Sequence, residues 1–128
     1  MTLVWNPEDV VDLYASMFRD GEDYSYIELP TSPHGRGNLG HADFVVRHDK
    51  VVGVSSGTVY SYYYRKMISL CSIDVAAADI GTDVLVKWGE FGKPIRDLRA
   101  TVARFPFLNE GRNQQVDVNT MPRVVAVS

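Results

Sequence analysis

Residues 42–73 of this chain read ADFVVRHDKVVGVSSGTVYSYYYRKMISLCSI, and this stretch decides the fold. β-Branched and aromatic residues dominate it, which favours strands over helices. Ala42–Arg47 and Val51–Val54 flank the polar residues His48-Asp49-Lys50, so the sequence predicts a hairpin with a tight turn. Gly57 interrupts the next run and predicts a bulge or bend.

Two further strands are expected within the same stretch, at Val59–Tyr64 and Met67–Ile73. Met67–Ile73 is the more apolar and should be central, with Ile68 and Leu70 or their neighbours buried. Cys71 lies in this run and is the only cysteine of the chain, so no intramolecular disulfide or thiolate zinc site can form. We expect a small core residue there; a nucleophile would need a base that the sequence does not reveal.

The chain continues as short strands on the C-terminal side. Asp83–Trp88 alternates apolar and polar residues, and Ile95–Phe105 is a longer strand candidate. Asp79–Thr82 and Gly89–Pro94 supply the turns between them. Closely spaced strands joined by short turns predict a mostly β fold, a small antiparallel barrel or sandwich.

A helix is expected on the N-terminal side, at about residues 7–19. Asn6 can cap it and Pro7 suits its first position. Its apolar stripe, which could face the core or a partner, consists of Val10, Leu13, Tyr14, Met17 and Phe18. Tyr24–Leu29 is a short strand candidate, and the glycines and prolines of about residues 30–40 predict a mobile loop.

The length of 128 residues fits a single domain, with a barrel at about residues 41–108 and a polar tail at 109–128. The tail ends in Val124–Val127, which could add an edge strand or dock in a groove. A net charge of −3 argues against a general nucleic-acid binder. No signal peptide or membrane-spanning run is present, so the expected location is cytoplasmic, without membrane contact.

No catalytic centre emerges from the spacing of reactive residues. His34, His41 and His48 are evenly spaced, but glycines and prolines surround them, so we expect solvated loop histidines and no metal site. The glycine-bearing stretches lack the strand, turn and helix context of a phosphate loop.

Aromatic and basic residues offer two weaker signals. Tyr60, Tyr62 and Tyr64 would share one face of a strand and could stack on bases or aromatic ligands, although half-buried structural rings are the simpler interpretation. Because odd and even positions alternate along a strand, the basic residues of the last strand candidate should not form one patch; these are Arg96, Arg99 and Arg104.

Several motifs nevertheless occur in an order that is known from one protein family. They are Gly53–Ser61, Lys66–Leu70, Gly81–Val86 and Arg99–Val102, followed by Pro106-Phe107. In this order they resemble the C-terminal domain of the glycine-cleavage T-protein family, the folate-dependent aminomethyltransferases. The opening Leu3–Val10, and Ser61-Tyr62 where the family has Ser-Pro, are most similar to the aryl-ether O-demethylase branch. The resemblance runs from about Leu3 to Phe107 and implies a small antiparallel Greek-key barrel.

The same resemblance limits the function that the chain could have alone. Enzymes of the family are much longer, and their folate pocket and catalytic acid lie mainly in preceding domains, so tetrahydrofolate is implied only by resemblance and no catalytic residue carries over. A last folate contact would fall near Arg112 by spacing, but the residue type is not reproduced.

The leading hypothesis is therefore a stand-alone C-terminal-type domain, an accessory or partner-binding module of one-carbon transfer. The alternatives are a subunit of a split methyltransferase or O-demethylase and an inactive truncated remnant. Expected partners are a second copy, forming a homodimer, or a separate folate-domain protein.

Overall fold

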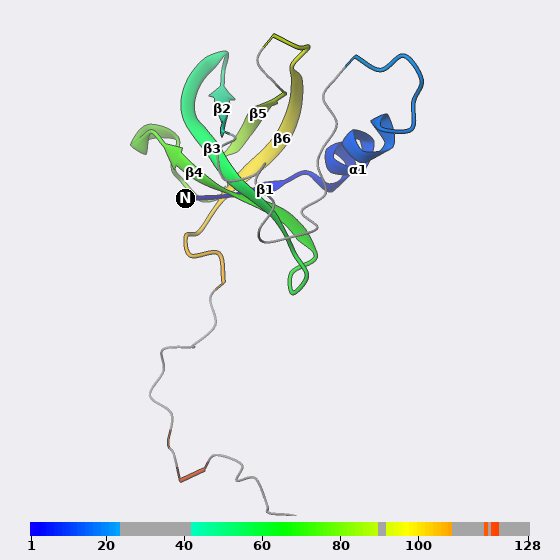
Figure 1. The fold of residues 1–128 in the computed structure, drawn as a ribbon. Helices are drawn as coiled ribbons and strands as arrows, with labels where there is room; N and C mark the ends of the chain where they lie inside the picture. The colour runs from blue at the N-terminus through cyan, green and yellow to red at the C-terminus, as the bar shows by residue number, and fades with distance from the viewer. Residues whose placement is uncertain (24–41, 90–91, 109–116, 118, 121–128) are drawn as a thin grey trace, which may run out of the picture.

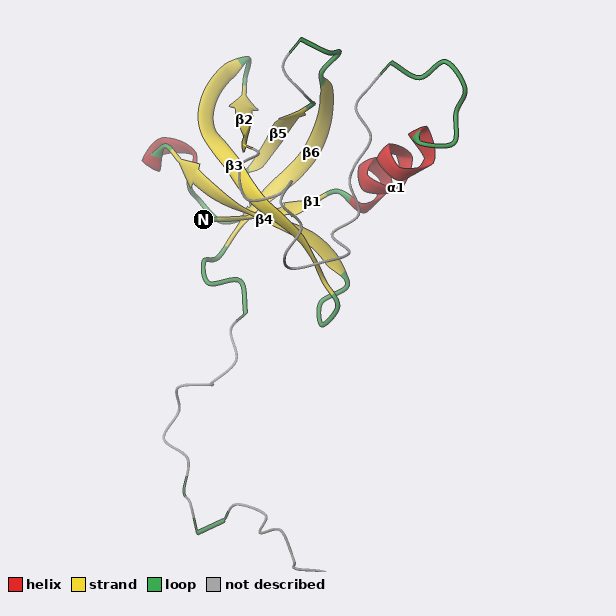
Figure 2. Ribbon diagram, viewed as in Figure 1, coloured by secondary structure: helices red, strands yellow, loops and turns green. Residues whose placement is uncertain are grey.

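The computed structural model of the chain describes residues 1–23, 42–89, 92–108, 117 and 119–120. These residues form a closed antiparallel barrel beside one α-helix, which confirms the predicted fold class (Figures 1 and 2). The elements, in chain order, are β1 (Thr2–Trp5), α1 (Pro7–Ser16), β2 (Ala42–Arg47), β3 (Lys50–Ser61), β4 (Lys66–Ile73), the 3-10 turn η1 (Val75–Ala77), β5 (Asp83–Trp88) and β6 (Arg96–Ala103).

The strands follow the order β1-β4-β3-β2-β5-β6 around the barrel. Consecutive hairpins join β2, β3 and β4, and β5 then returns to pair with β2 on the far side of the hairpins. This is the Greek-key connection. The β2–β3 turn is tight as predicted, since Arg47 pairs with Lys50 and both His48 and Asp49 have positive φ, as type I′ turns require.

β1 is a strand that the sequence analysis did not identify, because the barrel was expected to begin near residue 41. Four residues are too few for a strand period to stand out. In the structure β1 pairs antiparallel with β4 on one side and with β6 on the other. It therefore closes the barrel, and its side chains Leu3 and Trp5 enter the core.

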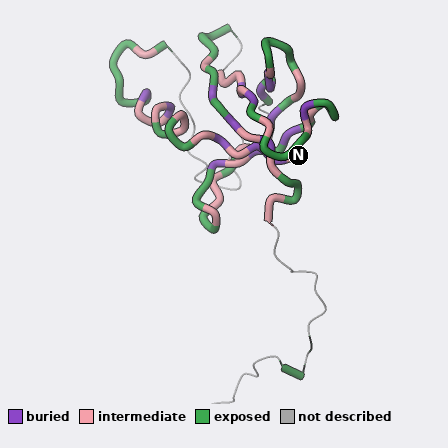
Figure 3. The backbone as a smooth tube through the Cα atoms, turned by 180° about the vertical axis from the view of Figure 1, so that it is seen from behind, coloured by how far each residue is buried: buried purple, intermediate pink, exposed green. Residues whose placement is uncertain are grey.

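Buried side chains from the six strands and from α1 fill the interior of the barrel. The buried residues are coloured along the backbone in Figure 3. Its fully buried members include Leu3, Trp5, Leu13, Val45, Val86, Leu98 and Val102. A short polar network is enclosed with them: the Trp5 indole N–H donates to Ser69 Oγ at 3.0 Å, and Ser69 Oγ lies 2.7 Å from Ser55 Oγ. These hydrogen bonds satisfy polar groups that burial would otherwise destabilise.

β4 pairs with β1 on one side and β3 on the other, as every strand of the closed barrel pairs twice, and its buried face is formed by the neighbours of Ile68 and Leu70. Met67, Ser69 and Cys71 point inward, whereas Ile68 is half-buried and Leu70 is 49% exposed. The prediction left the choice between the two faces open, and the inner face is the one that holds a serine. Ser69 is tolerated inside since Trp5 and Ser55 hydrogen-bond to it.

β3 is one continuous strand rather than the two runs expected. Its pairing with β4 shifts between Ser56 and Val59, where Gly57 has a φ of 61°, which confirms the predicted irregularity. The strand ends at Ser61, so Tyr62, Tyr63 and Tyr64 lie in the β3–β4 turn and not on a strand.

α1 lies beside the barrel and ends earlier than predicted, at Ser16 (Figure 1). The Asn6 side chain accepts hydrogen bonds from the Glu8 and Asp9 amides, as expected of its cap. Leu13 is buried and Val10 and Tyr14 pack on the core, but Phe18 lies beyond the helix and is 85% exposed. The predicted stripe therefore faces the core only in part.

Some expectations fall outside the described residues. These are the strand at Tyr24–Leu29, the loop at 30–40 and the terminal run Val124–Val127. The last strand, β6, ends at Ala103 and not at Phe105. In the part of the chain that the structure describes, no helix has the length and apolar content needed to cross a membrane.

The two faces of the barrel strands predict different responses to the same truncation. We expect Leu98→Ala, which removes a side chain with 1% exposure, to lower the free energy of unfolding by about 2–5 kcal/mol. Leu70→Ala, on an outward face, should cost roughly 0.5 kcal/mol. Urea denaturation of both variants measures this, and equal losses would contradict the assignment of faces.

Candidate functional site

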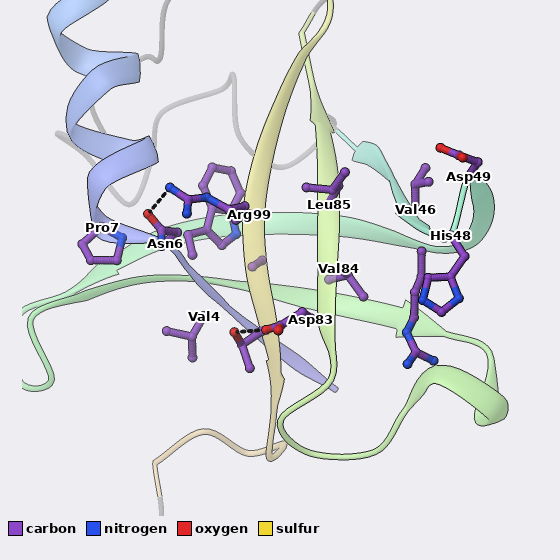
Figure 4. A pocket seen from close by; sticks show the side chains of 14 residues that line it. Val4, Asn6, Pro7, Val46, His48, Asp49, Asp83, Val84, Leu85 and Arg99 are labelled. Atoms are coloured by element: carbon purple, nitrogen blue, oxygen red, sulfur yellow. Dashed lines mark hydrogen bonds between the residues drawn. The ribbon is translucent and has the colours of Figure 1, made fainter.

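A hollow of about 660 Å³ lies on the outer face of the barrel, over the strands β1, β6, β5 and β2 (Figure 4). Strand register explains which side chains meet there. Val4, Thr101 and Asp83 form one row across β1, β6 and β5. Arg99, Leu85 and Val46 form a second row across β6, β5 and β2. All six line the hollow, a concave surface of the kind in which binding sites occur.

The start of α1 and the β2–β3 turn border the hollow. Asn6 and Pro7 lie on one side, and Arg47, His48 and Asp49 lie on the other (Figure 4). The floor is partly apolar, through Val4 and Leu85, while the borders are charged or polar. Such a mixture of an apolar floor and a few polar groups is typical of binding surfaces.

Arg99 is the best-anchored polar group of the hollow. Its Nε lies 3.0 Å from Asp9 Oδ2 and its Nη2 lies 2.7 Å from Asp9 Oδ1, a two-point ion pair. The backbone N–H of Arg99 also donates to Asp9 Oδ2 at 2.8 Å. The side-chain hydrogen bond from Arg99 holds the pKa of the Asp9 carboxyl below its ordinary value.

This contact fixes the beginning of α1 to β6. The Asn6 backbone N–H donates to the Arg99 carbonyl at 2.8 Å, and Arg99 Nη2 lies 3.4 Å from Asn6 Oδ1. One turn further along the helix, Asp12 forms an ion pair with Arg96. Sequence analysis missed both pairs because each joins residues more than 80 positions apart, and no local pattern indicates such a contact.

As predicted, Arg96, Arg99 and Arg104 of the last strand candidate do not form one patch. Arg99 is on the outer face of β6, whereas Arg96 is half-buried on the side of Leu98, and Arg104 lies beyond the strand. His48 is at the border of the hollow, and His34 and His41 fall outside the described residues, as does Arg112. Within the described ranges, no three His, Cys, Asp or Glu side chains gather as metal ligands would.

The prediction that Tyr60, Tyr62 and Tyr64 share one strand face is wrong, because β3 ends at Ser61. Tyr60 is on β3 and packs against the core, while Tyr62 and Tyr63 project from the turn with exposures of 85% and 73%. The rings contact one another edge to face: Tyr60 with Tyr62 at 5.1 Å between centroids, and Tyr63 with Tyr64 at 4.9 Å. This cluster lies on the β3–β4 turn and does not line the hollow.

Cys71 is a core residue, as expected. It is 5% exposed, and burial raises the pKa of its thiol. A thiol whose pKa is raised is a poorer nucleophile at neutral pH, because less of it is present as thiolate.

The hollow does not fit tetrahydrofolate as a complete pocket. Its central cation, Arg99, is already bonded to Asp9, and Asp83 accepts a hydrogen bond from Thr101 Oγ1 at 3.1 Å. The described residues enclose the recess only partly, whereas pockets for small ligands bury most of the ligand surface. We therefore assign no cofactor-binding or catalytic residue within the described part of the chain.

Two curated proteins are similar to nearly the whole chain. The sesamin methylene transferase of Sinomonas sp. (strain No.22) is 39% identical over 130 residues, which cover 96% of this chain and 29% of that protein. The syringate O-demethylase of Sphingobium sp. (strain NBRC 103272 / SYK-6) is 31% identical over 127 residues, covering 91% and 27% respectively. The chain thus spans less than a third of the length of these relatives. No protein-family profile matches it.

The Asp9–Arg99 pair predicts how stability depends on pH. Because the pKa of folded Asp9 is lowered, its stabilising contribution is present above about pH 4 and is lost as the pH falls through the folded value. We expect Asp9→Asn to lower the urea midpoint at pH 7, and the difference from the unchanged chain to shrink below pH 4. The pH series of urea midpoints measures this.

Glu8→Gln is the matched control. The Glu8 carboxylate is 3.9 Å from Arg99 Nη2 and its side chain is 87% exposed, so its removal should change the midpoint little at either pH. A difference between Asp9→Asn and the unchanged chain that persists unchanged at low pH would show that the ion pair is not the cause.

Proposed function

We propose that this chain is a barrel module of folate-dependent one-carbon transfer, comparable to the corresponding part of the methylene transferase and O-demethylase to which it is similar. One observation carries the proposal: at 39% identity the match covers 96% of this chain but only 29% of the relative. The folding unit that the two proteins share is therefore a fraction of that relative's length.

The module acts as an accessory or partner-binding part, and the folate-binding and catalytic groups belong to protein outside these 128 residues. The hollow supports this view, because one of its two arginines, Arg99, is already bonded to Asp9 and because the described residues enclose it only partly. Arg99 and Asp9 are thus suited to holding α1 in place and not to binding the cofactor. A folate-domain protein is the partner that the proposal implies.

The proposal predicts that the purified chain is inactive by itself. Incubation with tetrahydrofolate and either syringate or sesamin should give no demethylated or methylene-depleted product above a protein-free control, as followed by chromatography. Turnover by the purified chain would contradict the accessory role, since it would require a catalytic centre that the described residues lack.

A thermal melt supplies a second, independent measurement. A ligand that binds only the folded state raises the melting temperature. We expect a large excess of tetrahydrofolate to leave the melting temperature of the chain unchanged, because the hollow encloses a ligand only partly and its Arg99 is already paired with Asp9. A mixture of the chain with its partner, identified by affinity capture, should show a rise in melting temperature on adding tetrahydrofolate. This rise should exceed the one that the partner shows alone.

A further inference from the structure

The outer surface of the barrel is charged on the side formed by β5 and β6. The outward positions of these two strands include Asp83, Lys87, Asp97 and Arg99. Lys87 and Asp97 are cross-strand partners, and Lys87 Nζ lies 2.7 Å from Asp97 Oδ1. This is the ordinary pattern of an antiparallel sheet, in which apolar side chains face the core and polar side chains face water.

The outer surface of β2, β3 and β4 departs from this pattern. Phe44 on β2 pairs directly with Val54 on β3. Val54 is in turn a diagonal neighbour of Leu70 across the pairing of β3 with β4. Ile68 follows on the same side of β4 and pairs directly with Val59. We call this contiguous set of outward side chains the apolar face; it consists of Phe44, Val54, Val59, Ile68 and Leu70.

Water reaches most of the apolar face, although the face carries no charge of its own. Four of its side chains are between 38% and 61% exposed, and Ile68 is half-buried. Asp43 is buried, and the other charged residues of the three strands lie at strand ends; these are Arg47, Lys50 and Lys66. Contiguous apolar surface from which charges are excluded is typical of the core of a protein interface.

The size and curvature of the apolar face argue against a second copy as its occupant. The exposed parts of its side chains present roughly 400 Å² of apolar surface, a patch of the size that is often functional on a monomer. Two copies meeting there would bury roughly 800 Å² of it in total, whereas stable dimers bury at least about 1,200 Å². The outside of a closed barrel is convex, so two such faces diverge around their point of contact. A wider contact requires a concave partner.

We propose that the apolar face is the surface on which the barrel packs against its folate-domain partner. The inference rests on the proposed function and names the surface that this function uses. In the two relatives the matched unit makes up 29% and 27% of a longer chain, so more than two thirds of each relative lies outside it. The partner's surface is concave, apolar and poor in charge, because a charge buried against Phe44 or Leu70 would lose its hydration without gaining an ion-pair partner.

Affinity capture from the native cell supplies the partner, and a variant of the apolar face tests where it binds. We expect the unchanged chain to capture a protein similar to the part of the two relatives outside the match. Phe44→Ser combined with Leu70→Ser should bind that purified protein at least about tenfold more weakly, as measured by calorimetry, because two large exposed side chains are lost. Phe18→Ser is the matched control and should bind as the unchanged chain does, since Phe18 is 85% exposed but lies beyond α1.

Cysteine labelling gives a second measurement that leaves most of the apolar face intact. Leu70→Cys places a thiol on the face, while Cys71 is 5% exposed and should not react in the folded chain. We expect the partner to slow maleimide labelling of Leu70→Cys several-fold and to leave the labelling of Phe18→Cys unchanged. Thermal melts establish that each variant is folded, and the labelling decides the matter if the double serine variant is not.

Three results would overturn the inference, and they separate it from the proposed function. Undiminished binding by the double serine variant, with no protection of Leu70→Cys, places the contact elsewhere and leaves the proposed function standing. A mass of twice 14.3 kDa in light scattering that falls to a single chain in the double serine variant assigns the face to a second copy. The absence of a folate-domain protein among the captured proteins contradicts the proposed function itself, and the inference with it.

Discussion

Closure of the barrel by β1 is the constraint on which the rest of the structure depends. β1 is the first strand in sequence, yet it pairs with β4 and β6, which follow it by more than sixty and ninety residues. Without it, both partners would present unpaired strand edges to solvent, a state that favours aggregation. The same four residues deliver Leu3 and Trp5 to the core. Backbone closure of the barrel and packing of its core therefore depend on the same four residues.

The position of α1 and the shape of the hollow follow from that closure. Asn6 comes directly after β1, and its backbone N–H bonds to the Arg99 carbonyl on β6. The helix thus begins where the strand pairing ends, and Asp9 meets Arg99 one turn later. The hollow lies across the same junction, since one of its rows runs from Val4 on β1 through Thr101 on β6 to Asp83 on β5. Any change that displaces β1 would alter the hollow as well.

Local features of this fold were predictable from the sequence, and features that depend on distant residues were not. The His48-Asp49 turn, the irregularity at Gly57 and the buried Cys71 follow from neighbouring residues, and the structure confirms them. The sequence left open which face of β4 points inward, because Ser69 is stabilised inside by Trp5, 64 positions away in sequence. Of the candidate site, His48 and Arg99 were noticed, but Arg47 and the surroundings of these residues were not. The ion pair of Asp9 with Arg99 depends on strand register around the whole barrel, which no short window reveals.

The contact between the two tryptophans gives this barrel an internal optical reporter. Trp5 on β1 and Trp88 on β5 are the only tryptophans of the chain, and their rings meet edge to face with centroids 5.7 Å apart. Their strands are not neighbours in the sheet, because β6 lies between them. The indoles can couple only when β1 is seated in the barrel. Near-ultraviolet circular dichroism and indole fluorescence therefore report directly whether β1 is seated in the barrel, with no label added to the protein.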